Sequence, residues 1–173
     1  LLDCGTGVGD LSLDRLTQIR HIFVTHAHLD HVCMLPLLVD SVFDSLEQNP
    51  ITLYTSQAVH DILYEHLFNW QIWPDFFTLP SEDNPVLVSR ILEPGESVEV
   101  NGRAVTALPV SHAVPAQGYA VAQNYGAVLA FSGDTGTGEA FWDSLNALPR
   151  LDHLLVECAF PEQERDLAKA AKH

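Results

Sequence analysis

The sequence has little positive charge. Its 173 residues include 8 Lys and Arg against 23 Asp and Glu, which gives a formal net charge of -15. Nucleic-acid polymers and anionic membranes are bound largely through basic side chains, so this composition argues against both as partners. Hydrophobic residues make up 47% of the chain and charged residues 18%. That is enough apolar material for a sizeable core, and it argues against a disordered chain.

Cysteine and long apolar runs are scarce as well. The three cysteines, Cys4, Cys33 and Cys158, form no C-x-x-C pair and do not predict a disulfide framework. No apolar run reaches the roughly 20 residues of a membrane span. No signal peptide is visible, but the sequence does not begin with Met, so that absence means little. The location that we expect is cytoplasmic. The sequence opens on Leu1 in what reads as a strand and stops at His173 in what reads as a helix. We therefore expect part of a longer protein, truncated at both ends.

Strand and helix signals alternate along the chain and predict an α/β fold in a single domain over residues 1–173. Residues 1–3 are expected to be the end of a strand. Further strands are expected over 19–25, 51–54, 86–92, 98–100, 103–110, 118–122, 127–131 and 151–156. The expected helices cover 32–43, 56–68, 139–148 and 162–172, with Ser56 as an N-cap. An aromatic loop is expected over 69–85 and a turn at Asn124-Tyr125-Gly126.

Histidine is what the sequence has in excess, with nine residues. The densest group is Thr25-His26-Ala27-His28-Leu29-Asp30-His31, directly after a predicted strand. Alternate side chains of an extended segment share a face, so His26 and His28 can point at one ion. If a helix follows, Asp30 and His31 can turn toward a second ion. Imidazole nitrogens and carboxylate oxygens suit zinc, manganese or iron, and a solvated polar turn is the alternative interpretation.

Two ions need more ligands than this group supplies. His112 follows the predicted strand 103–110, and Asp134 stands in Ser132-Gly133-Asp134-Thr135-Gly136 after the strand 127–131. His112 could complete the first set, and Asp134 lies in a glycine-flanked turn where it could bridge both ions. Each alone is an ordinary residue at the end of a strand. The first group makes the metal interpretation stronger for both.

The pattern H-x-H-x-D-H, followed by a His after a strand and an Asp in S-G-D-T, resembles the metallo-β-lactamase superfamily. The resemblance implies an αββα sandwich that holds two divalent metal ions, with zinc as the expected metal. It implies that His26, His28 and His112 hold one ion, that Asp30 and His31 hold the other, and that Asp134 bridges them. In the opening L-L-D-C-G-T-G, Asp3 matches a residue that is usually structural in the superfamily.

Further segments resemble bacterial class II 3′,5′-cyclic-nucleotide phosphodiesterases and cover nearly the whole chain. The discriminating ones are W-Q-I-W-P-D-F and H-A-V-P-A-Q-G-Y. Met34 departs from the small residue that is common at this position in the family. The second ion takes a late histidine in the family, downstream of a segment whose first residue His173 matches. That last ligand is expected beyond His173, which the resemblance makes an acid/base histidine that Glu157 could orient.

The implied reaction converts a cyclic nucleotide, cAMP or cGMP, to the nucleoside 5′-monophosphate. Two ions can lower the pKa of a bridging water, and the resulting hydroxide would attack phosphorus. Asp30, His173 and Glu157 are the expected catalytic residues. Trp70 and Trp73 could stack on the base, although packing inside their loop is the simpler interpretation. The expected partner is a small molecule, and the oligomeric state is left open, with a homodimer as one option.

Two rival hypotheses stay open at this point. Another hydrolase with the same fold, such as an RNA 3′-processing nuclease, a thioesterase or a lactonase, would use the same metal chemistry. A metal-binding or regulatory module without turnover is the second rival, because one ligand of the second ion is missing from these residues.

Overall fold

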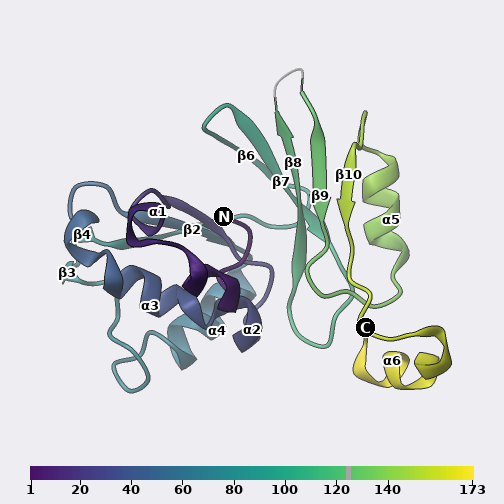
Figure 1. Cartoon of the computed structure of the whole chain (residues 1–173), viewed down its shortest axis with the longest axis horizontal. Helices are drawn as coiled ribbons and strands as arrows, with labels where there is room; N and C mark the ends of the chain where they lie inside the picture. Colours follow the sequence, from purple (N-terminus) through teal and green to yellow (C-terminus); the bar gives the residue numbers. More distant parts are fainter. Residues whose placement is uncertain (124–125) are drawn as a thin grey trace. The chain divides into compact units, whose positions relative to one another are not determined.

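The computed structural model describes residues 1–123 and 126–173, so Asn124 and Tyr125 of the expected turn lie outside the described residues. The chain divides into two compact units, an N-terminal unit, Leu1–Ile91, and a C-terminal unit, Leu92–His173 (Figure 1). Each unit has its own sheet, and each is described by itself below. The expectation of one domain over the whole chain stays a prediction.

The N-terminal unit is built on a parallel sheet with the strand order β1-β2-β5. The strands are β1 (His21–Phe23), β2 (Ile51–Thr55) and β5 (Leu87–Ile91). Parallel neighbours need a crossover, and helices supply it: α2 (Leu29–Val32) and α3 (Met34–Ser41) between β1 and β2, and α4 (Gln57–His66) between β2 and β5. The remaining elements are 3-10 helices at Thr6–Asp10 and Phe43–Ser45, α1 (Leu13–Leu16), and a small hairpin of β3 (Pro80–Ser81) and β4 (Asn84–Pro85).

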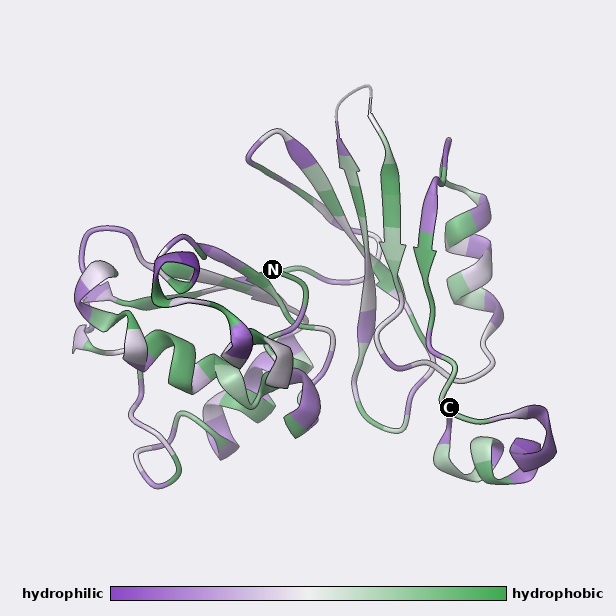
Figure 2. Ribbon diagram, viewed as in Figure 1, coloured by the Kyte–Doolittle hydropathy of each residue, from purple (hydrophilic) through white to green (hydrophobic). Residues whose placement is uncertain are grey.

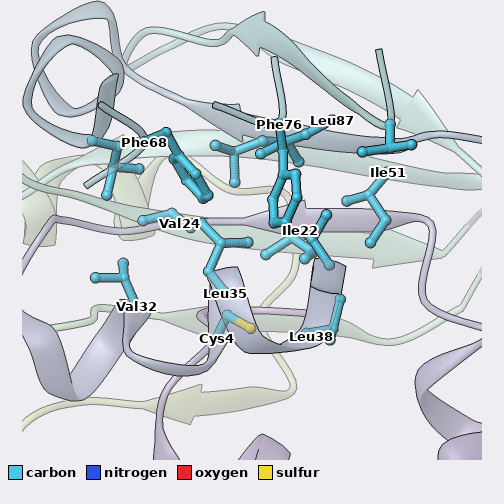
Figure 3. Packing of buried hydrophobic residues seen from close by; sticks show 14 of the residues in the cluster. Cys4, Ile22, Val24, Val32, Leu35, Leu38, Ile51, Phe68, Phe76 and Leu87 are labelled. Carbon is cyan, nitrogen blue, oxygen red and sulfur yellow. The ribbon is translucent and has the colours of Figure 1, made fainter. Parts of the chain in front are cut away.

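A single apolar cluster holds the N-terminal unit together (Figure 3). Ile22 and Leu53 stand opposite each other in the β1–β2 register and are fully buried, as are Leu35 and Leu38 of α3. Alternation along β1 and β2 therefore directs one face of the sheet at the helices. Ser56 caps α4, because its hydroxyl accepts a hydrogen bond from the Val59 amide at 3.4 Å, which confirms the predicted N-cap.

The C-terminal unit is built on a five-stranded sheet with the order β10-β9-β8-β7-β6. The strands are β6 (Ser97–Val100), β7 (Arg103–Pro109), β8 (Gln117–Gln123), β9 (Val128–Phe131) and β10 (His153–Leu155). Helix α5 (Glu139–Asn146) buries Phe141 and Leu145 against this sheet, and its apolar and polar residues alternate along the ribbon (Figure 2). A 3-10 helix (Glu162–Glu164) leads into α6 (Arg165–Ala171), which contains no buried residue.

Strand direction decides where the polar loops of the C-terminal unit lie. β7 is antiparallel to β8, β8 is antiparallel to β9, and β9 is parallel to β10. β7, β9 and β10 therefore run in the same direction, and their carboxyl ends lie at the same edge of the sheet. Residues that follow these three strands can meet there, although they are far apart in the sequence.

The eight strands predicted between residues 19 and 156 are confirmed, with boundaries that differ by at most two residues. The sequence-based prediction missed α1 and the β3–β4 hairpin, which are too short for a periodic pattern. The segment 32–43, predicted as one helix, belongs to two helices, α2 and α3. The first of these begins three residues before the predicted start, directly after His28. Among the described residues, no helix has the length and apolar character that crossing a membrane would require.

Candidate functional site

The histidine-rich segment of the N-terminal unit lies on the loop between β1 and α2. Residues 24–28 have no regular secondary structure, His28 has an extended backbone, and the chain turns into α2 at Leu29. The rings of His26 and His28 lie 4.6 Å apart, and those of His26 and His31 lie 4.2 Å apart. Nε2 of His31 is 3.4 Å from Oδ2 of Asp30. The loop and the turn into α2 thus bring these four side chains into one cluster, and their role as metal ligands stays a prediction.

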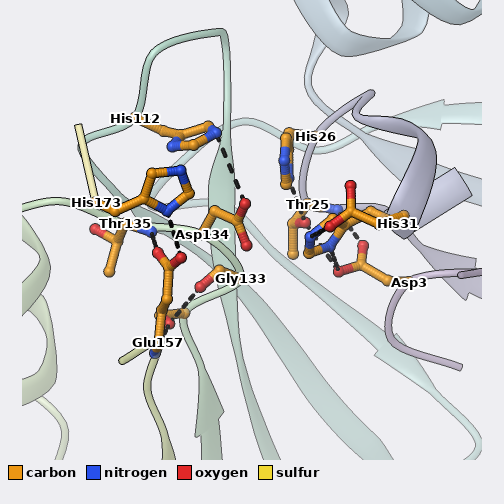
Figure 4. A network of polar contacts seen from close by, with 12 residues as sticks. Asp3, Thr25, His26, His31, His112, Gly133, Asp134, Thr135, Glu157 and His173 are labelled. Atoms are coloured by element: carbon orange, nitrogen blue, oxygen red, sulfur yellow. Dashed lines mark hydrogen bonds and ion pairs between the residues drawn. The ribbon is translucent and has the colours of Figure 1, made fainter. Parts of the chain in front are cut away.

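Asp3 fixes this loop from an earlier part of the chain (Figure 4). Its Oδ1 accepts a hydrogen bond from the Thr25 amide at 2.7 Å. Its Oδ2 accepts one from the Thr25 hydroxyl at 2.9 Å and lies 2.7 Å from Nδ1 of His31. The backbone of Asp3 has a positive φ of 52°, a conformation that most residues avoid. The strained residue is therefore held by the same contacts that orient His31.

Gly5 allows the opening segment to lie against α2. A Cβ at this position would overlap the carbonyl oxygen of Asp30. The Cys4 amide donates to the His31 carbonyl at 2.7 Å, and the Met34 amide donates to the Cys4 carbonyl at 2.9 Å. Burial, with smaller effects of Cys33 and Asp3, raises the pKa of the Cys4 thiol to about 12. Since a thiol binds metal as the thiolate, Cys4 is a packing residue and not a candidate ligand.

A second polar cluster lies at one sheet edge of the C-terminal unit. His112 follows β7, Asp134 follows β9 and Glu157 follows β10. Nε2 of His112, whose side chain is fully buried, is 3.8 Å from Oδ2 of Asp134. One ligand-type atom from each of Asp134, Glu157 and His173 lies within 4.8 Å of the others. The shared direction of the three strands explains why these distant residues meet.

Glu157 and His173 form a hydrogen-bonded pair within this cluster (Figure 4). Nδ1 of His173 contacts Oε1 of Glu157, while Oε2 of Glu157 accepts a hydrogen bond from the Thr135 amide at 2.6 Å. The Glu157 amide donates to the Ser132 hydroxyl at 3.1 Å. The ring of His173 lies 5.1 Å from that of His112. The structure therefore brings the two residues together as the resemblance implies, and their catalytic role stays a prediction.

The two tryptophans lie in the loop that follows α4. Trp70 is 63% exposed, and its backbone has a positive φ of 64°. The Trp70 amide donates to the Trp73 carbonyl at 2.9 Å, and Trp73 packs against the apolar cluster of the N-terminal unit. This placement gives Trp73 a packing role, whereas base stacking by either residue stays a prediction.

The donor set of both clusters suits a divalent metal ion. Imidazole nitrogens and carboxylate oxygens are the ligands of zinc, manganese and iron sites. His26 and His31 each contact an oxygen atom through Nδ1, the Thr25 hydroxyl and the Asp3 carboxylate. Metal-binding histidines are commonly held in this way, with the other ring nitrogen toward the ion. Sequence reasoning missed Thr25, Ser132 and Thr135, whose only signal is that they adjoin the predicted ligands.

A family model described as "Beta-lactamase superfamily domain" matches residues 1–171 of the chain. The chain belongs to the beta-lactamase superfamily. A protein of known structure, the metallo-beta-lactamase fold protein YhfI from Bacillus subtilis, has a similar fold, with a TM-score of 0.73 at 15% sequence identity over 99% of this chain and 63% of that one. The predicted α/β fold class is confirmed, and this fold implies divalent metal ions.

Two groups of curated relatives differ in function. The chain is 34% identical to a 3′,5′-cyclic-nucleotide phosphodiesterase of Aliivibrio fischeri over 141 residues, which are 78% of this chain and 39% of that protein. It is 29% identical to a ribonuclease Z of Methanosarcina acetivorans over 127 residues, which are 72% of this chain and 39% of that protein. The chain thus spans less than half the length of these relatives, and the predicted resemblance to the phosphodiesterases is confirmed.

Proposed function

We propose that this chain is the metal-binding part of a phosphodiesterase that hydrolyses 3′,5′-cyclic nucleotides, cAMP or cGMP, to nucleoside 5′-monophosphates. The Glu157–His173 pair beside Asp134 carries the proposal, because hydrolysis of a phosphodiester expels a poor alkoxide leaving group that needs a general acid. The likeness to the Aliivibrio fischeri phosphodiesterase supports the substrate class.

The proposed ligands come from both clusters, and their assignment follows the order of the superfamily motifs. By that order, His26, His28 and His112 would hold one ion, Asp30 and His31 would hold the other, and Asp134 would serve both. Bound divalent ions supply a water of lowered pKa and neutralise charge on the phosphate oxygens. Zinc is the proposed metal, with manganese and iron as alternatives, and metal analysis of the purified protein by mass spectrometry checks both identity and number.

The residues of the chain supply orientation and a proton. The Asp3 carboxylate and the Thr25 hydroxyl hold His31 and His26 in place. Glu157 accepts the Nδ1 hydrogen of His173 and so fixes the orientation of the ring. As the oxygen of a water that has lost one proton to solvent bonds to phosphorus and the P–O3′ bond breaks, Nε2 of His173 gives its proton to O3′. Asp30, whose side chain is 74% exposed, is proposed to act both as a ligand and in positioning the water.

An RNA 3′-processing nuclease is the second candidate, because ribonuclease Z proteins are similar to this chain at comparable identity. The charge argues against it. A polymer with many phosphates is bound through Lys and Arg, and the chain has 8 of these against 23 acidic residues. The proposed partner is therefore a small cyclic nucleotide. Trp70 and Trp73 as base-stacking residues, a homodimer and a cytoplasmic location are parts of the proposal that need separate tests.

A substrate panel tests the proposal. The metal-loaded protein is assayed with cAMP, cGMP, a precursor tRNA, a thioester and a lactone, beside His112→Ala and a control, His66→Ala, whose side chain is 66% exposed. We expect cyclic-nucleotide hydrolysis that His112→Ala abolishes and His66→Ala retains. Turnover of precursor tRNA or thioester without cyclic-nucleotide hydrolysis would contradict the substrate class. Ion binding without turnover of any substrate would favour the non-catalytic module.

A further inference from the structure

One carboxylate, Asp3, contacts two candidate ligand histidines by different routes. It contacts His31 directly, with Oδ2 at 2.7 Å from Nδ1. It reaches His26 through Thr25, whose hydroxyl lies 2.9 Å from Oδ2 of Asp3 and 3.0 Å from Nδ1 of His26. All four side chains belong to the N-terminal unit, and Thr25 and His26 are fully buried. The hydrogens of this network can therefore be assigned without reference to solvent.

The assignment follows from counting hydrogens. An ionised carboxylate accepts hydrogen bonds and cannot donate, while a threonine hydroxyl has one hydrogen and two lone pairs. The Thr25 hydroxyl must give its hydrogen to Asp3, which leaves only lone pairs to face His26. Nδ1 of His26 therefore carries the ring hydrogen and donates it to Thr25. The same reasoning places a hydrogen on Nδ1 of His31, which donates to Asp3.

A neutral imidazole with its hydrogen on Nδ1 has its lone pair on Nε2. We infer that Thr25 is a positioning residue, which relays the charge of Asp3 to His26 and fixes the ring in the tautomer whose Nε2 can bind a metal ion. Asp3 acts on both rings, whereas Thr25 acts only on His26. The inference rests on the proposed metal-binding function for its consequence, but the tautomer itself is a property of the metal-free chain.

The two residues should therefore differ in what their replacement does. Thr25→Val keeps the shape of the side chain and removes the hydroxyl, so His26 loses its acceptor while His31 keeps Asp3. Replacing a hydrogen-bond partner of a metal ligand typically lowers metal affinity by about 10- to 100-fold. We expect a loss of that size for one of two ions in Thr25→Val, and for both ions in Asp3→Asn. Thr25→Ser retains the hydroxyl and should restore affinity.

The control is Thr55→Val. Thr55 is also a fully buried threonine of the N-terminal unit, and its hydroxyl donates to the Val24 carbonyl at 3.0 Å. The Thr55→Val substitution removes an equivalent buried hydroxyl hydrogen bond and leaves the contact between Thr25 and His26 unchanged. Each variant is first compared with the unmodified protein by thermal unfolding without metal, so that a general loss of structure is separated from a change at His26.

Two readouts decide the matter. Nitrogen-15 spectra of the metal-free protein at about pH 8, where histidine is neutral, report the tautomer of His26. Stepwise titration with Zn²⁺ against a chromogenic chelator reports the affinity for each ion. We expect the Nδ1–H form of His26 in the unmodified protein, Thr25→Ser and Thr55→Val, and its loss in Thr25→Val. A Thr25→Val protein that matches Thr55→Val in both readouts would overturn the inference.

The same measurements separate this inference from the proposed function. If the unmodified protein binds no Zn²⁺, the proposed function fails, and the tautomer spectra still decide whether Thr25 fixes His26. If zinc binds but His26 has its hydrogen on Nε2 in the metal-free protein, the inference fails and the metal site stands.

Discussion

The two units assemble their polar clusters by different means. In the N-terminal unit, His26, His28, Asp30 and His31 lie on one loop, and Asp3 and Gly5 hold that loop in place. In the C-terminal unit, the cluster members at 112, 134, 157 and 173 come from the ends of three strands and from the residues after α6. The first cluster depends on one loop and on its contacts with the opening segment, and the second depends on the order and direction of strands.

The largest effect is expected at His173, which tests whether the strand-end cluster contains a general acid. His173→Ala removes the proposed proton donor and should lower kcat for cAMP by about 10²–10⁴-fold, without loss of bound metal. A substrate with a p-nitrophenolate leaving group should lose much less, because that group leaves without protonation. The measurement is the ratio of kcat values for the two substrates.

The exposed His66 provides the matched control, and His66→Ala should leave both rates unchanged. An equal loss on the two substrates would mean that His173 holds the structure of the C-terminal cluster and does not donate a proton. In that case the strand-end cluster would be a metal-binding arrangement only.

The second effect is a loss of stability in the N-terminal cluster. A Cβ at Gly5 would overlap the backbone of Asp30, whereas a Cβ at Gly7 has nothing within 4 Å. Gly5→Ala should lower the free energy of unfolding by about 1–3 kcal/mol or more, because backbone must move to make room. Gly7→Ala should have little effect. Urea unfolding of the two variants measures the difference, and equal values would show that the opening segment does not brace the histidine loop.

A smaller effect is expected at the start of α4. This helix of the N-terminal unit has a side-chain cap from Ser56, while α5 of the C-terminal unit has Gly138 at its N-cap and no side-chain cap. Ser56→Ala should cost about 1 kcal/mol of unfolding free energy. Ser12, which precedes α1 and makes no cap hydrogen bond through its side chain, is the control. Unfolding midpoints that fall equally for Ser56→Ala and Ser12→Ala would contradict the role of the cap.

The smallest effect compares two exposed carboxylates. The pKa of Asp152 in the C-terminal unit is lowered chiefly by hydrogen bonds from the Arg150 guanidinium. Nε of Arg150 lies 2.8 Å from Oδ1 and 2.7 Å from Oδ2 of Asp152. The pKa of Asp61 in the N-terminal unit is lowered chiefly by a hydrogen bond from the neutral Gln57 amide at 2.7 Å. Salt screens a charged partner more than a neutral one, so added salt should raise the pKa of Asp152 further.

The sign follows from the lowered pKa. Such a carboxylate stabilises the folded protein above the pKa of the unfolded chain, and the contribution disappears as the pH falls through the folded-state value. Nuclear magnetic resonance titration at low and high salt measures both groups. An equal response of Asp61 and Asp152 to salt would mean that the charge of Arg150 contributes nothing.

Most of the secondary structure could be predicted from the sequence, because the strands are apolar runs bounded by turn residues and α4 has a recognisable cap. The clustering of the candidate ligands over residues 26–31 could also be predicted, since they are neighbours in the sequence. The β3–β4 hairpin and α1 could not, because two to four residues show no period. Thr25 was missed because a threonine before a histidine has no distinguishing pattern until its hydroxyl is seen between Asp3 and His26.

The sequence by itself determined the fold class, the family resemblance and the spacing that brings His26 and His28 together. Only the tertiary structure decided which oxygen atoms hold the histidine rings, and that Asp134, Glu157 and His173 meet at one edge of a sheet. The physical reason is the range of the interactions. Neighbouring side chains are arranged by the local backbone, whereas residues far apart in the sequence meet only when strand pairing sets the direction of the segments that precede them.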